Sequence, residues 1–321
     1  MKKLIQDKTT ILSDMLEGLA LSNPEQTVIS ETVVVRKEKK QQGVALVSGG
    51  GSGHEPAHAG YVAQGMLDAA VCGEIFTSPT PDKILEAIKA VDNGDGVLLI
   101  IKNYAGDVMN FEMAQEMAEM EGIKVGKVIV RDDIAVEDKE MRRGVAGTVF
   151  VHKFAGYLAE QGESLETIVE QTEALLADMR TIGMALTPPF VPSTGKYGFD
   201  LESGDMEIGI GIHGERGLKR EAVKPIQDIA TELVQALNEE VQAKEVIVMV
   251  NGMGGTPLSE LNIAVKYIQA ALEAENVSVK DWFVGDYMTS LDMQGFSLTL
   301  LESTEDRLNA LNAPTTSRYF G

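Results

Sequence analysis

The spacing of apolar and polar positions predicts strands that alternate with helices along most of the chain. Short apolar runs, many of them β-branched, are typical of buried strands. Strands are expected at residues 32–36, 44–47, 71–76, 96–102, 125–130, 206–213, 246–250 and 295–301. Apolar residues at helical spacing predict helices at residues 11–21, 61–70, 83–91, 108–121, 165–179, 225–239 and 259–275, with one more from about residue 147. This order indicates an α/β fold, in which largely parallel or mixed sheets are flanked by helices.

A segment rich in proline and glycine, residues 187–195, interrupts this alternation. Such a segment is typical of a domain boundary or a crossover between domains. The chain has 321 residues, which is enough for two domains. We therefore expect two α/β domains, at residues 1–186 and 187–321.

A cluster of glycines follows the strand expected at residues 44–47. The sequence there is SGGGSGH, from Ser48 to His54, and a helix can begin at Pro56. Glycines let the backbone approach a ligand closely, and a helix start offers free N–H groups to an anion. The alternative is a plain turn whose histidine caps or packs. Four glycines in five positions cost chain entropy without a return in packing, which favours a ligand site.

The glycine cluster does not match the common nucleotide fingerprints. A P-loop needs lysine and then serine or threonine after its last glycine, whereas His54 follows Gly53. The dinucleotide motif needs glycine at its first, third and sixth places, and the sixth place is His54 when counted from Gly49 and Pro56 when counted from Gly51. We therefore expect this loop not to hold ATP or NAD through either fingerprint.

Two other predicted strand ends carry ionisable side chains. Lys102 ends an apolar strand, and Asp107 lies at the start of the next helix. As alternatives, Lys102 would be a solvated strand end and Asp107 a helix cap. His213 ends an alternating strand in which Gly209 and Gly211 share its face, which would leave space beside the imidazole. The alternative interpretation is that the glycines pack the strand tightly on a helix and that His213 is only hydrogen-bonded at the rim of that contact.

The remaining candidates for chemistry carry a weaker signal. His58 lies four residues after His54, but a zinc site needs a third ligand at a workable spacing, and none is visible. We therefore expect no metal on this chain, a packed or surface position for His58, and a place for His152 beside the core. Four methionines have helical spacing and are expected in the core: Met109, Met113, Met117 and Met120.

The charge balance narrows the classes of partner. The formal net charge is −21, and the pI is about 4.6. This acidity argues against nucleic acid and anionic membrane surfaces, because both need a basic face. No apolar run has the roughly 18 residues of a spanning helix, and the start of the chain lacks the apolar stretch of a signal peptide. The single cysteine, Cys72, excludes an internal disulfide and suits a reducing compartment, so we expect a cytoplasmic protein.

Seven motifs, in order along nearly the whole chain, together form a specific pattern. They are SGGGSGHEPAH (48–58), FTSPTP (76–81), KNYAGDVMNF (102–111), GVAGT (144–148), GIGIHGE (209–215), NGMGGTPLSEL (251–261) and YMTSLDMQGF (287–296). They closely resemble the dihydroxyacetone kinase K subunit, the dihydroxyacetone-binding subunit of a phosphotransferase-system-dependent kinase. The resemblance implies a role in glycerol metabolism.

The resemblance also implies roles for individual residues. His213 would hold the ketone as a covalent hemiaminal. His54 would act as the general base on the hydroxyl that is phosphorylated, and Asp107 would bind that hydroxyl. The further substrate-binding residues implied are Gly51, Ser52, Gly53 and Lys102.

The resemblance implies partners as well. This chain would carry no cofactor, because ADP or ATP with Mg²⁺ would remain on a separate L subunit. An M subunit of the phosphoenolpyruvate-dependent phosphotransferase system would recharge that nucleotide. The chain ends after the K region without a nucleotide-binding L domain, and a homodimer is expected.

Two other functions stay open. Only residues 139–141 separate Asp138 from Arg142, where family members carry a longer segment. The runner-up is a paralogue that keeps the ketone-binding histidine and acts, without kinase activity, as a coactivator of a transcription regulator. A third interpretation is an isomerase or aldolase-type enzyme in which His54 and Asp107 serve as base and acid.

Overall fold

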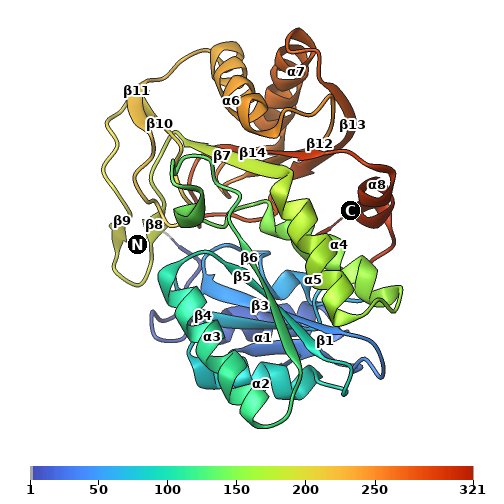
Figure 1. The fold of residues 1–321 in the computed structure, drawn as a ribbon. Coiled ribbons are helices and arrows are strands. Elements are labelled where there is room, and N and C mark those ends of the chain that lie inside the picture. The colour runs from blue at the N-terminus through green and yellow to red at the C-terminus, as the bar shows by residue number, and fades with distance from the viewer. Residues whose placement is uncertain (1–2, 321) are drawn as a thin grey trace.

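The computed structural model describes residues 3–320, which form two six-stranded sheets with helices packed on them. Figure 1 shows the two sheets one above the other, with α4 (Thr148–Glu160) between them. Phe150 of α4 belongs to a core cluster that also contains Leu98 from the first sheet and Met249 from the second. The two halves therefore share one continuous core. No helix within residues 3–320 combines the length and the apolar character needed to cross a membrane.

The first sheet has the strand order β1-β2-β4-β3-β5-β6. Its strands are β1 (Gln26–Ile29), β2 (Val33–Arg36), β3 (Ala45–Ser52), β4 (Ala69–Ile75), β5 (Val97–Lys102) and β6 (Val125–Val130). Strands β4, β3, β5 and β6 are parallel, whereas β1 and β2 are antiparallel to their neighbours. The carboxyl ends of the parallel strands therefore lie at one edge, where α/β sheets place ligand sites.

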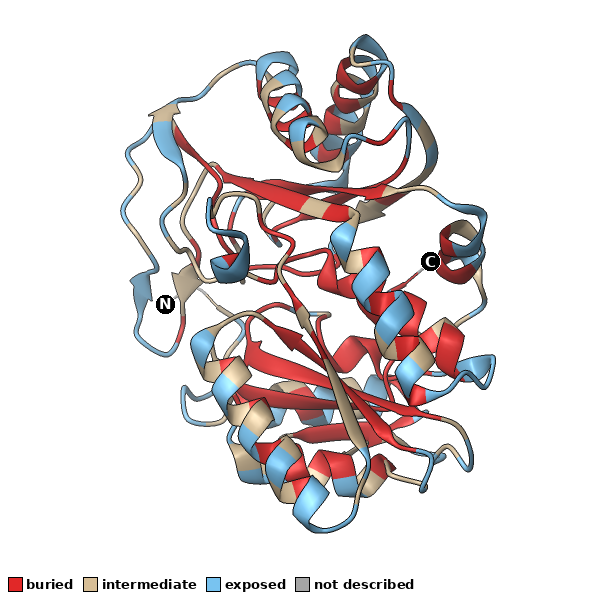
Figure 2. Ribbon diagram, viewed as in Figure 1, coloured by how far each residue is buried: buried red, intermediate tan, exposed pale blue. Residues whose placement is uncertain are grey.

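Helices cover both faces of this sheet. One core cluster contains α2 (Pro81–Val91), α3 (Ala105–Met120) and the odd-numbered residues of β5. The other contains α1 (Ile11–Ser22), α4, α5 (Leu165–Ala177) and the even-numbered residues of β5. Because β5 is buried on both faces, it is apolar at every position from Val97 to Ile101 rather than alternating. Figure 2 shows these buried strands between helices whose outer faces are exposed.

The second sheet has the order β11-β10-β7-β14-β12-β13, and only β12 and β13 are parallel. Its strands are β7 (Met179–Ala185), β10 (Asp205–Ile208), β11 (Lys219–Ala222), β12 (Glu245–Gly252), β13 (Ser278–Gly285) and β14 (Gly295–Glu302). Helices α6 (Ile226–Val241) and α7 (Leu258–Ala274) pack on its outer face, and α8 (Glu305–Asn312) packs on α4. The small elements are β8 (Phe190–Val191), β9 (Lys196–Tyr197), η1 (Ala59–Tyr61) and η2 (Lys139–Met141).

The mixed α/β architecture confirms the fold class expected from the sequence. Strand β7, which the sequence did not reveal, already belongs to the second sheet, although it precedes residue 187. The segment at residues 187–195 forms β8 and a turn. We would therefore place the change of sheet at Met179.

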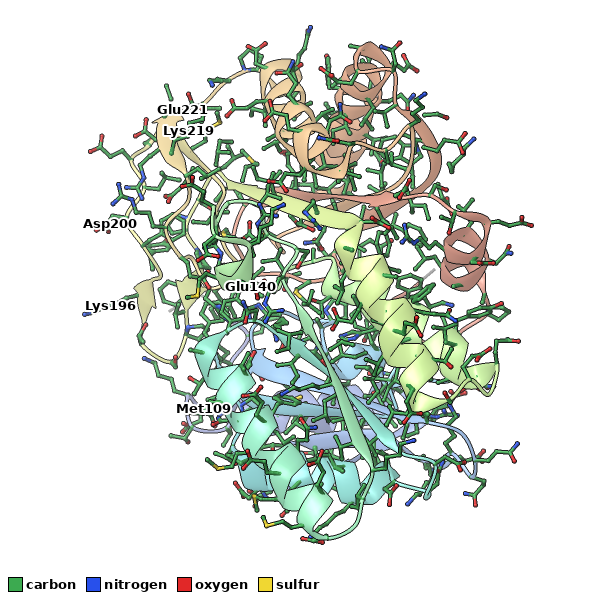
Figure 3. The ribbon with its side chains drawn as sticks, viewed as in Figure 1. Met109, Glu140, Lys196, Asp200, Lys219 and Glu221 are labelled. Carbon is green, nitrogen blue, oxygen red and sulfur yellow. The ribbon has the colours of Figure 1, made fainter. Side chains whose placement is uncertain are left out.

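Several local predictions were wrong. In place of the helix expected at residues 61–70, the chain has the last residue of η1, a turn at Gly65 (φ +78°) and the start of β4. The strand expected to reach His213 ends at Ile208, because Gly209 adopts φ +81° and leaves the sheet. The methionines of α3 are largely outside the core: Met109 is 60% exposed and Met120 is 80% exposed. Figure 3 shows Met109 on the outer side of α3.

Candidate active site

Most of the glycine cluster is part of a strand and not the loop after a strand that the sequence predicted. Gly49 and Gly51 lie within β3. A Cβ atom on Gly49 would overlap the carbonyl oxygen of Val71 in β4, and one on Gly51 would collide with the backbone at Phe76 and Thr77. The glycines therefore allow β3 to lie very close to the backbone of β4 and of the segment after it. Because only η1 follows, the helix start expected to supply N–H donors is absent from this part of the structure.

His54 comes directly after this strand and is fully buried. Its Nδ1 lies 2.8 Å from the carbonyl oxygen of Thr289. A carbonyl only accepts, so Nδ1 carries the proton and Nε2 carries the lone pair. Among residues 3–320, Nε2 has no hydrogen-bond partner. Burial, and next the charges of His213 and Lys102, lower the pKa of His54 well below its usual value, so the ring is a neutral base.

His213 lies beside His54, with 4.7 Å between the ring centroids. Its Nδ1 is 2.8 Å from Oε1 of Glu215, while its backbone N–H donates to Oε2 at 2.9 Å. Burial alone would raise the pKa of Glu215, but the hydrogen bond and charge of His213 lower it to about 2. The carboxylate therefore fixes the proton on Nδ1 and leaves the Nε2 lone pair of His213 free. The His213 side chain is 20% exposed, so it is reachable from solvent.

Two aromatic side chains enclose these imidazoles. The Phe76 ring stacks on His54 at 5.2 Å and meets the edge of His213 at the same centroid distance. The Tyr104 ring lies 4.6 Å from His213. Burial, followed by the charge of Glu215, raises the pKa of Tyr104 well above its usual value, so its phenol remains neutral. These walls limit access of water to the pair of histidines.

Lys102 and Asp107 complete the site from the end of β5 and the first turn of α3. The Lys102 Nζ lies 3.3 Å from Oδ2 of Asp107, and both side chains are buried. Lys102 is therefore not the solvated strand end of the alternative interpretation. Tyr104 occupies the cap position of α3, so Asp107 is not its capping residue. Gly50 makes room for this pair, because a Cβ there would overlap Nζ and lie 3.4 Å from Oδ2.

The polar groups of Ser52 and Gly53 are engaged within the protein. The Ser52 hydroxyl donates to the carbonyl oxygen of Gly73 at 2.7 Å. The Gly53 N–H donates to the Glu55 carboxylate at 3.0 and 3.1 Å. Gly51 and Gly53 thus shape the strand end that carries His54, and their role in substrate binding stays a prediction.

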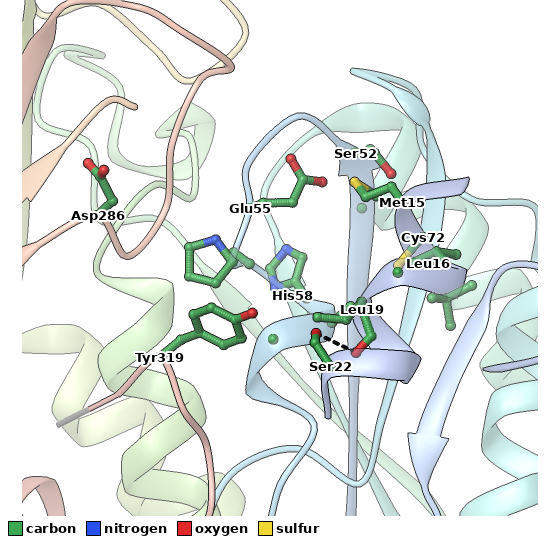
Figure 4. A pocket seen from close by; sticks show the side chains of 18 residues that line it. Met15, Leu16, Leu19, Ser22, Ser52, Glu55, His58, Cys72, Asp286 and Tyr319 are labelled. Carbon is green, nitrogen blue, oxygen red and sulfur yellow. Dashed lines mark hydrogen bonds between the residues drawn. The ribbon is translucent and has the colours of Figure 1, made fainter. Parts of the chain in front are cut away.

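A separate apolar cavity of about 480 Å³ lies beside α1 (Figure 4). Met15, Leu16 and Leu19 of α1 line it together with Ser52 and Cys72. The residues that line this cavity include neither His213 nor Asp107, so it is distinct from the paired imidazoles.

The loop that carries His213 is tied to the first half of the chain. Arg143 donates from Nε to Oδ2 of Asp133 at 2.8 Å and from Nη2 to the Gly209 carbonyl at 2.9 Å. Burial raises the pKa of Asp133 to about 7, and the charge of Arg143 opposes that shift. This contact fixes the start of the loop whose end presents His213.

The structure thus brings His54, His213, Lys102 and Asp107 together. Sequence reasoning assigned no role to four other residues of the site: Phe76, Tyr104, Glu215 and Thr289. Each of them lies within one of the seven motif segments, which was the available signal. Within the described residues, no group of three or more His, Cys, Asp or Glu side chains has the geometry to hold a metal ion.

Comparison with known proteins agrees with this architecture. A family model described as the Dak1 domain matches residues 17–319. The chain is 51% identical over 314 residues, and 95% of each chain, to the "PTS-dependent dihydroxyacetone kinase, dihydroxyacetone-binding subunit DhaK" of Lactococcus lactis. It is 49% identical over 315 residues, and 96% of each chain, to the "PTS-dependent dihydroxyacetone kinase 1, dihydroxyacetone-binding subunit DhaK" of Listeria innocua.

A solved structure described as "Dihydroxyacetone kinase operon co-activator Dha-DhaQ" superposes on this chain with a TM-score of 0.93. The two are 40% identical, and the match covers 97% of this chain and 98% of the other. The family model and these relatives extend over both sheets and over every residue of the site. The chain therefore belongs to the Dak1 domain family.

Proposed function

We propose that this chain binds dihydroxyacetone covalently on His213 and presents one of its hydroxyl groups for phosphorylation. The observation that carries the proposal is the pair of imidazoles, in which Glu215 and Thr289 each hold a proton on Nδ1 and leave Nε2 free. The names of the relatives, which are dihydroxyacetone-binding subunits of kinases, support the choice of substrate.

The first step is the addition of His213 to the ketone. The Nε2 lone pair forms a bond to the carbonyl carbon as the carbon–oxygen π bond breaks. The Nδ1 proton passes to Glu215 and is relayed from there through solvent to the alkoxide oxygen. The neutral hemiaminal therefore forms with no proton gained or lost overall, and Glu215 ends as a carboxylate. An alcohol offers no carbonyl carbon, so the site would capture dihydroxyacetone or glyceraldehyde and reject glycerol. Fixing a small triose in this way can contribute ~7–11 kcal/mol to the later step.

The second step needs a base at the hydroxyl that is phosphorylated. His54 Nε2 is free and lies in the ring packed against His213, so it is placed to take that proton. Asp107 would accept a hydrogen bond from the same hydroxyl and orient it. A general base of this kind contributes on the order of 10²–10⁴-fold to the rate.

The phosphoryl donor would come from another subunit. The glycine cluster lies inside β3 and lacks a nucleotide fingerprint, which supports a donor nucleotide, ADP or ATP with Mg²⁺, on a separate L subunit. The relatives' description as phosphotransferase-system-dependent supports recharging by an M subunit, with phosphoenolpyruvate as the original donor. We further propose a cytoplasmic location, in keeping with the single cysteine, and a homodimer, which the resemblance to the family implies.

A second candidate is a coactivator that binds the ketone without transferring phosphate. The similarity to the co-activator structure over nearly the whole chain favours it. The short segment at η2 would favour it too, were this loop to border the docking surface for an L subunit. Both candidates use His213, and they differ only in whether His54 and Asp107 act on the bound triose.

Two measurements test the proposal in sequence. Dihydroxyacetone labelled with ¹³C at the carbonyl carbon should lose its ketone resonance on binding the wild-type chain and keep it with the His213→Ala variant. A ketone signal that persists with the wild-type protein would exclude the hemiaminal. Reconstitution with L and M subunits and phosphoenolpyruvate should then yield dihydroxyacetone phosphate. Adduct formation without turnover by any L subunit would favour the coactivator.

A further inference from the structure

The chain contains four histidines, and two of them take no part in the chemistry proposed above. These two, His58 and His152, form a buried chain of hydrogen bonds that begins at Lys102. The Lys102 Nζ lies 2.9 Å from His58 Nε2, and His58 Nδ1 lies 2.9 Å from His152 Nε2. All three side chains are at most 4% exposed. This series of hydrogen bonds runs from Lys102 in the active site to His152 in α4.

The ammonium group of Lys102, at the start of this series, has two hydrogen-bond acceptors and one ion-pair partner. The acceptors are the Gly49 carbonyl oxygen at 3.0 Å and His58 Nε2 at 2.9 Å, and the ion-pair partner is Asp107 Oδ2 at 3.3 Å. Because an ammonium can only donate, His58 Nε2 must accept, and the proton of His58 is on Nδ1. That proton is donated to His152 Nε2, so His152 carries its own proton on Nδ1. In the described part of the chain, His152 Nδ1 has no partner.

If these hydrogen bonds ran in the opposite direction, from His152 to Lys102, Lys102 would have to be a neutral amine. A proton on His58 Nε2 would then point at a lone pair on Nζ, and the buried Asp107 carboxylate would face an uncharged amine in place of an ammonium. Burial, and next the charge of Lys102, lower the pKa of His58 well below its usual value. Ser48 does not compete, because its hydroxyl donates to the Ile100 carbonyl at 2.7 Å. The neighbouring charges therefore favour an ammonium followed by two neutral imidazoles.

We propose that His58, backed by His152, is a positioning residue that holds the Lys102 ammonium against Asp107. The Gly49 carbonyl holds the ammonium from one side, Gly50 leaves it room, and His58 supplies the side-chain hydrogen bond to Nζ. Without His58, Nζ could turn away from Asp107, and a buried ammonium would lose one of its two hydrogen-bond acceptors. The effect on phosphoryl transfer rests on the proposed function, whereas the proton positions do not.

Substitutions that keep or remove the hydrogen bonds separate positioning from packing. In His58→Gln, the amide oxygen can accept from Lys102 and the amide nitrogen can donate to His152. In His58→Leu, both bonds are lost at a similar side-chain volume. We expect kcat to fall by ~10–100-fold in His58→Leu and to recover most of that loss in His58→Gln. Triose adduct formation on His213 should change far less than kcat in both variants.

A matched control is Thr172→Val in α5. Thr172 is fully buried and its hydroxyl has no partner within residues 3–320, so the change removes a buried polar atom that is not among the partners of Lys102. This variant should keep the wild-type kcat. Equal kcat in His58→Leu and the wild type, or no recovery in His58→Gln, would overturn the proposal.

The closing experiment needs neither substrate nor a partner subunit. Because the chain has four histidines, a long-range ¹H–¹⁵N spectrum of the ¹⁵N-histidine-labelled protein resolves every ring. We expect His58 and His152 each to show a protonated Nδ1 and an unprotonated Nε2, with single substitutions giving the assignment. A proton on Nε2 of His58 would overturn the proposal even if the wild-type chain forms the adduct. Failure of the adduct with the expected proton positions would instead overturn the proposed function alone.

Discussion

The ring of His213 meets that of His54 edge-on, with 4.7 Å between the centroids, although the two residues come from loops of different sheets. Each ring has its Nδ1 proton fixed by a separate acceptor, Glu215 for His213 and Thr289 for His54. One ring is suited to attack a carbonyl carbon and the other to accept a proton. The division of labour therefore comes from the geometry around two identical side chains.

Replacing the base should slow turnover and spare binding. In His54→Ala, we expect kcat in the reconstituted kinase to fall by ~10²–10⁴-fold, because no other unpaired base in the described site occupies that position. The hemiaminal on His213 should remain, because Glu215 and His213 are unchanged. Kinetic measurements check the fall in kcat, and ¹³C spectra of the same preparation check that the hemiaminal remains. Loss of the adduct in this variant would contradict the assignment of separate roles.

The carboxylate behind His213 should control adduct formation. In Glu215→Gln, the amide oxygen can still accept a hydrogen bond from Nδ1 of His213. It cannot take the proton that the imidazole releases when Nε2 forms its bond to the carbonyl carbon. We expect the affinity for dihydroxyacetone to fall by ~10–100-fold, since hydrogen bonds to charged groups contribute about 1.5–3 kcal/mol. Titration followed by the ¹³C signal measures this. Glu221→Gln, which changes a carboxylate in β11, is the control and should bind like the wild type.

Gly50 should tolerate no side chain. In Gly50→Ala, the added Cβ would occupy the position of the Lys102 ammonium and press on Asp107. We expect kinase activity to be lost, while the fold persists because the displaced group is the end of a long side chain. Circular dichroism and activity together check this. Gly18→Ala is the matched control: it lies in α1 with open space around its Cα, and it should stabilise the helix by ~0.5–1 kcal/mol with no loss of activity.

Buried histidines should make the fold sensitive to mild acid. Burial, and next the charge of Lys102, lower the pKa of His152 to about 3. In the unfolded chain the same ring takes up a proton near pH 6.5. The unfolded state therefore binds more protons between these values, and stability is lost as the pH falls from about 6.5 towards 3. His152 alone should contribute a slope of ~1.4 kcal/mol per pH unit within that window.

Urea unfolding at several pH values below 6.5 measures this slope. His54 and His58, whose pKa values are also lowered well below their usual values, should steepen it. Because buried carboxyl groups with a raised pKa, such as Asp133, give a slope of the opposite sign, the wild type is compared with His152→Gln. Equal slopes for the two proteins between pH 4.5 and 6.5 would show that His152 is protonated in the native state.

The α/β class could be predicted because strands such as β5 and β6 are buried by helices and read as apolar runs. The failures have identifiable causes. Helix-compatible residues 61–70 are held in irregular structure by turns at Gly60 and Gly65 that fit against the C-terminal segment near Tyr319 and Thr315. Most methionines at helical spacing lie outside the core because α3 packs on the sheet through Phe111, Ala114 and Ala118.

Much of the site could be predicted from the sequence, because His54, Lys102 and Asp107 lie at or just after the carboxyl ends of strands that share one sheet edge. The partners that set proton positions were not accessible. Thr289 reaches His54 only through the folding of the second sheet onto the first. His58 was expected to be packed or on the surface, and it is packed, but its link to Lys102 depends on a contact across β3 that no spacing in the sequence reveals.

The hydrogen bond from His54 to Thr289 has a consequence for any attempt to divide this polypeptide. A fragment that ends before Met179 would contain the ring but not the carbonyl oxygen that selects its tautomer. The complementary fragment would contain His213 and Glu215 but no neighbouring base. Neither piece alone would hold a working pair, so we expect catalytic competence to appear only when the two pieces reassociate.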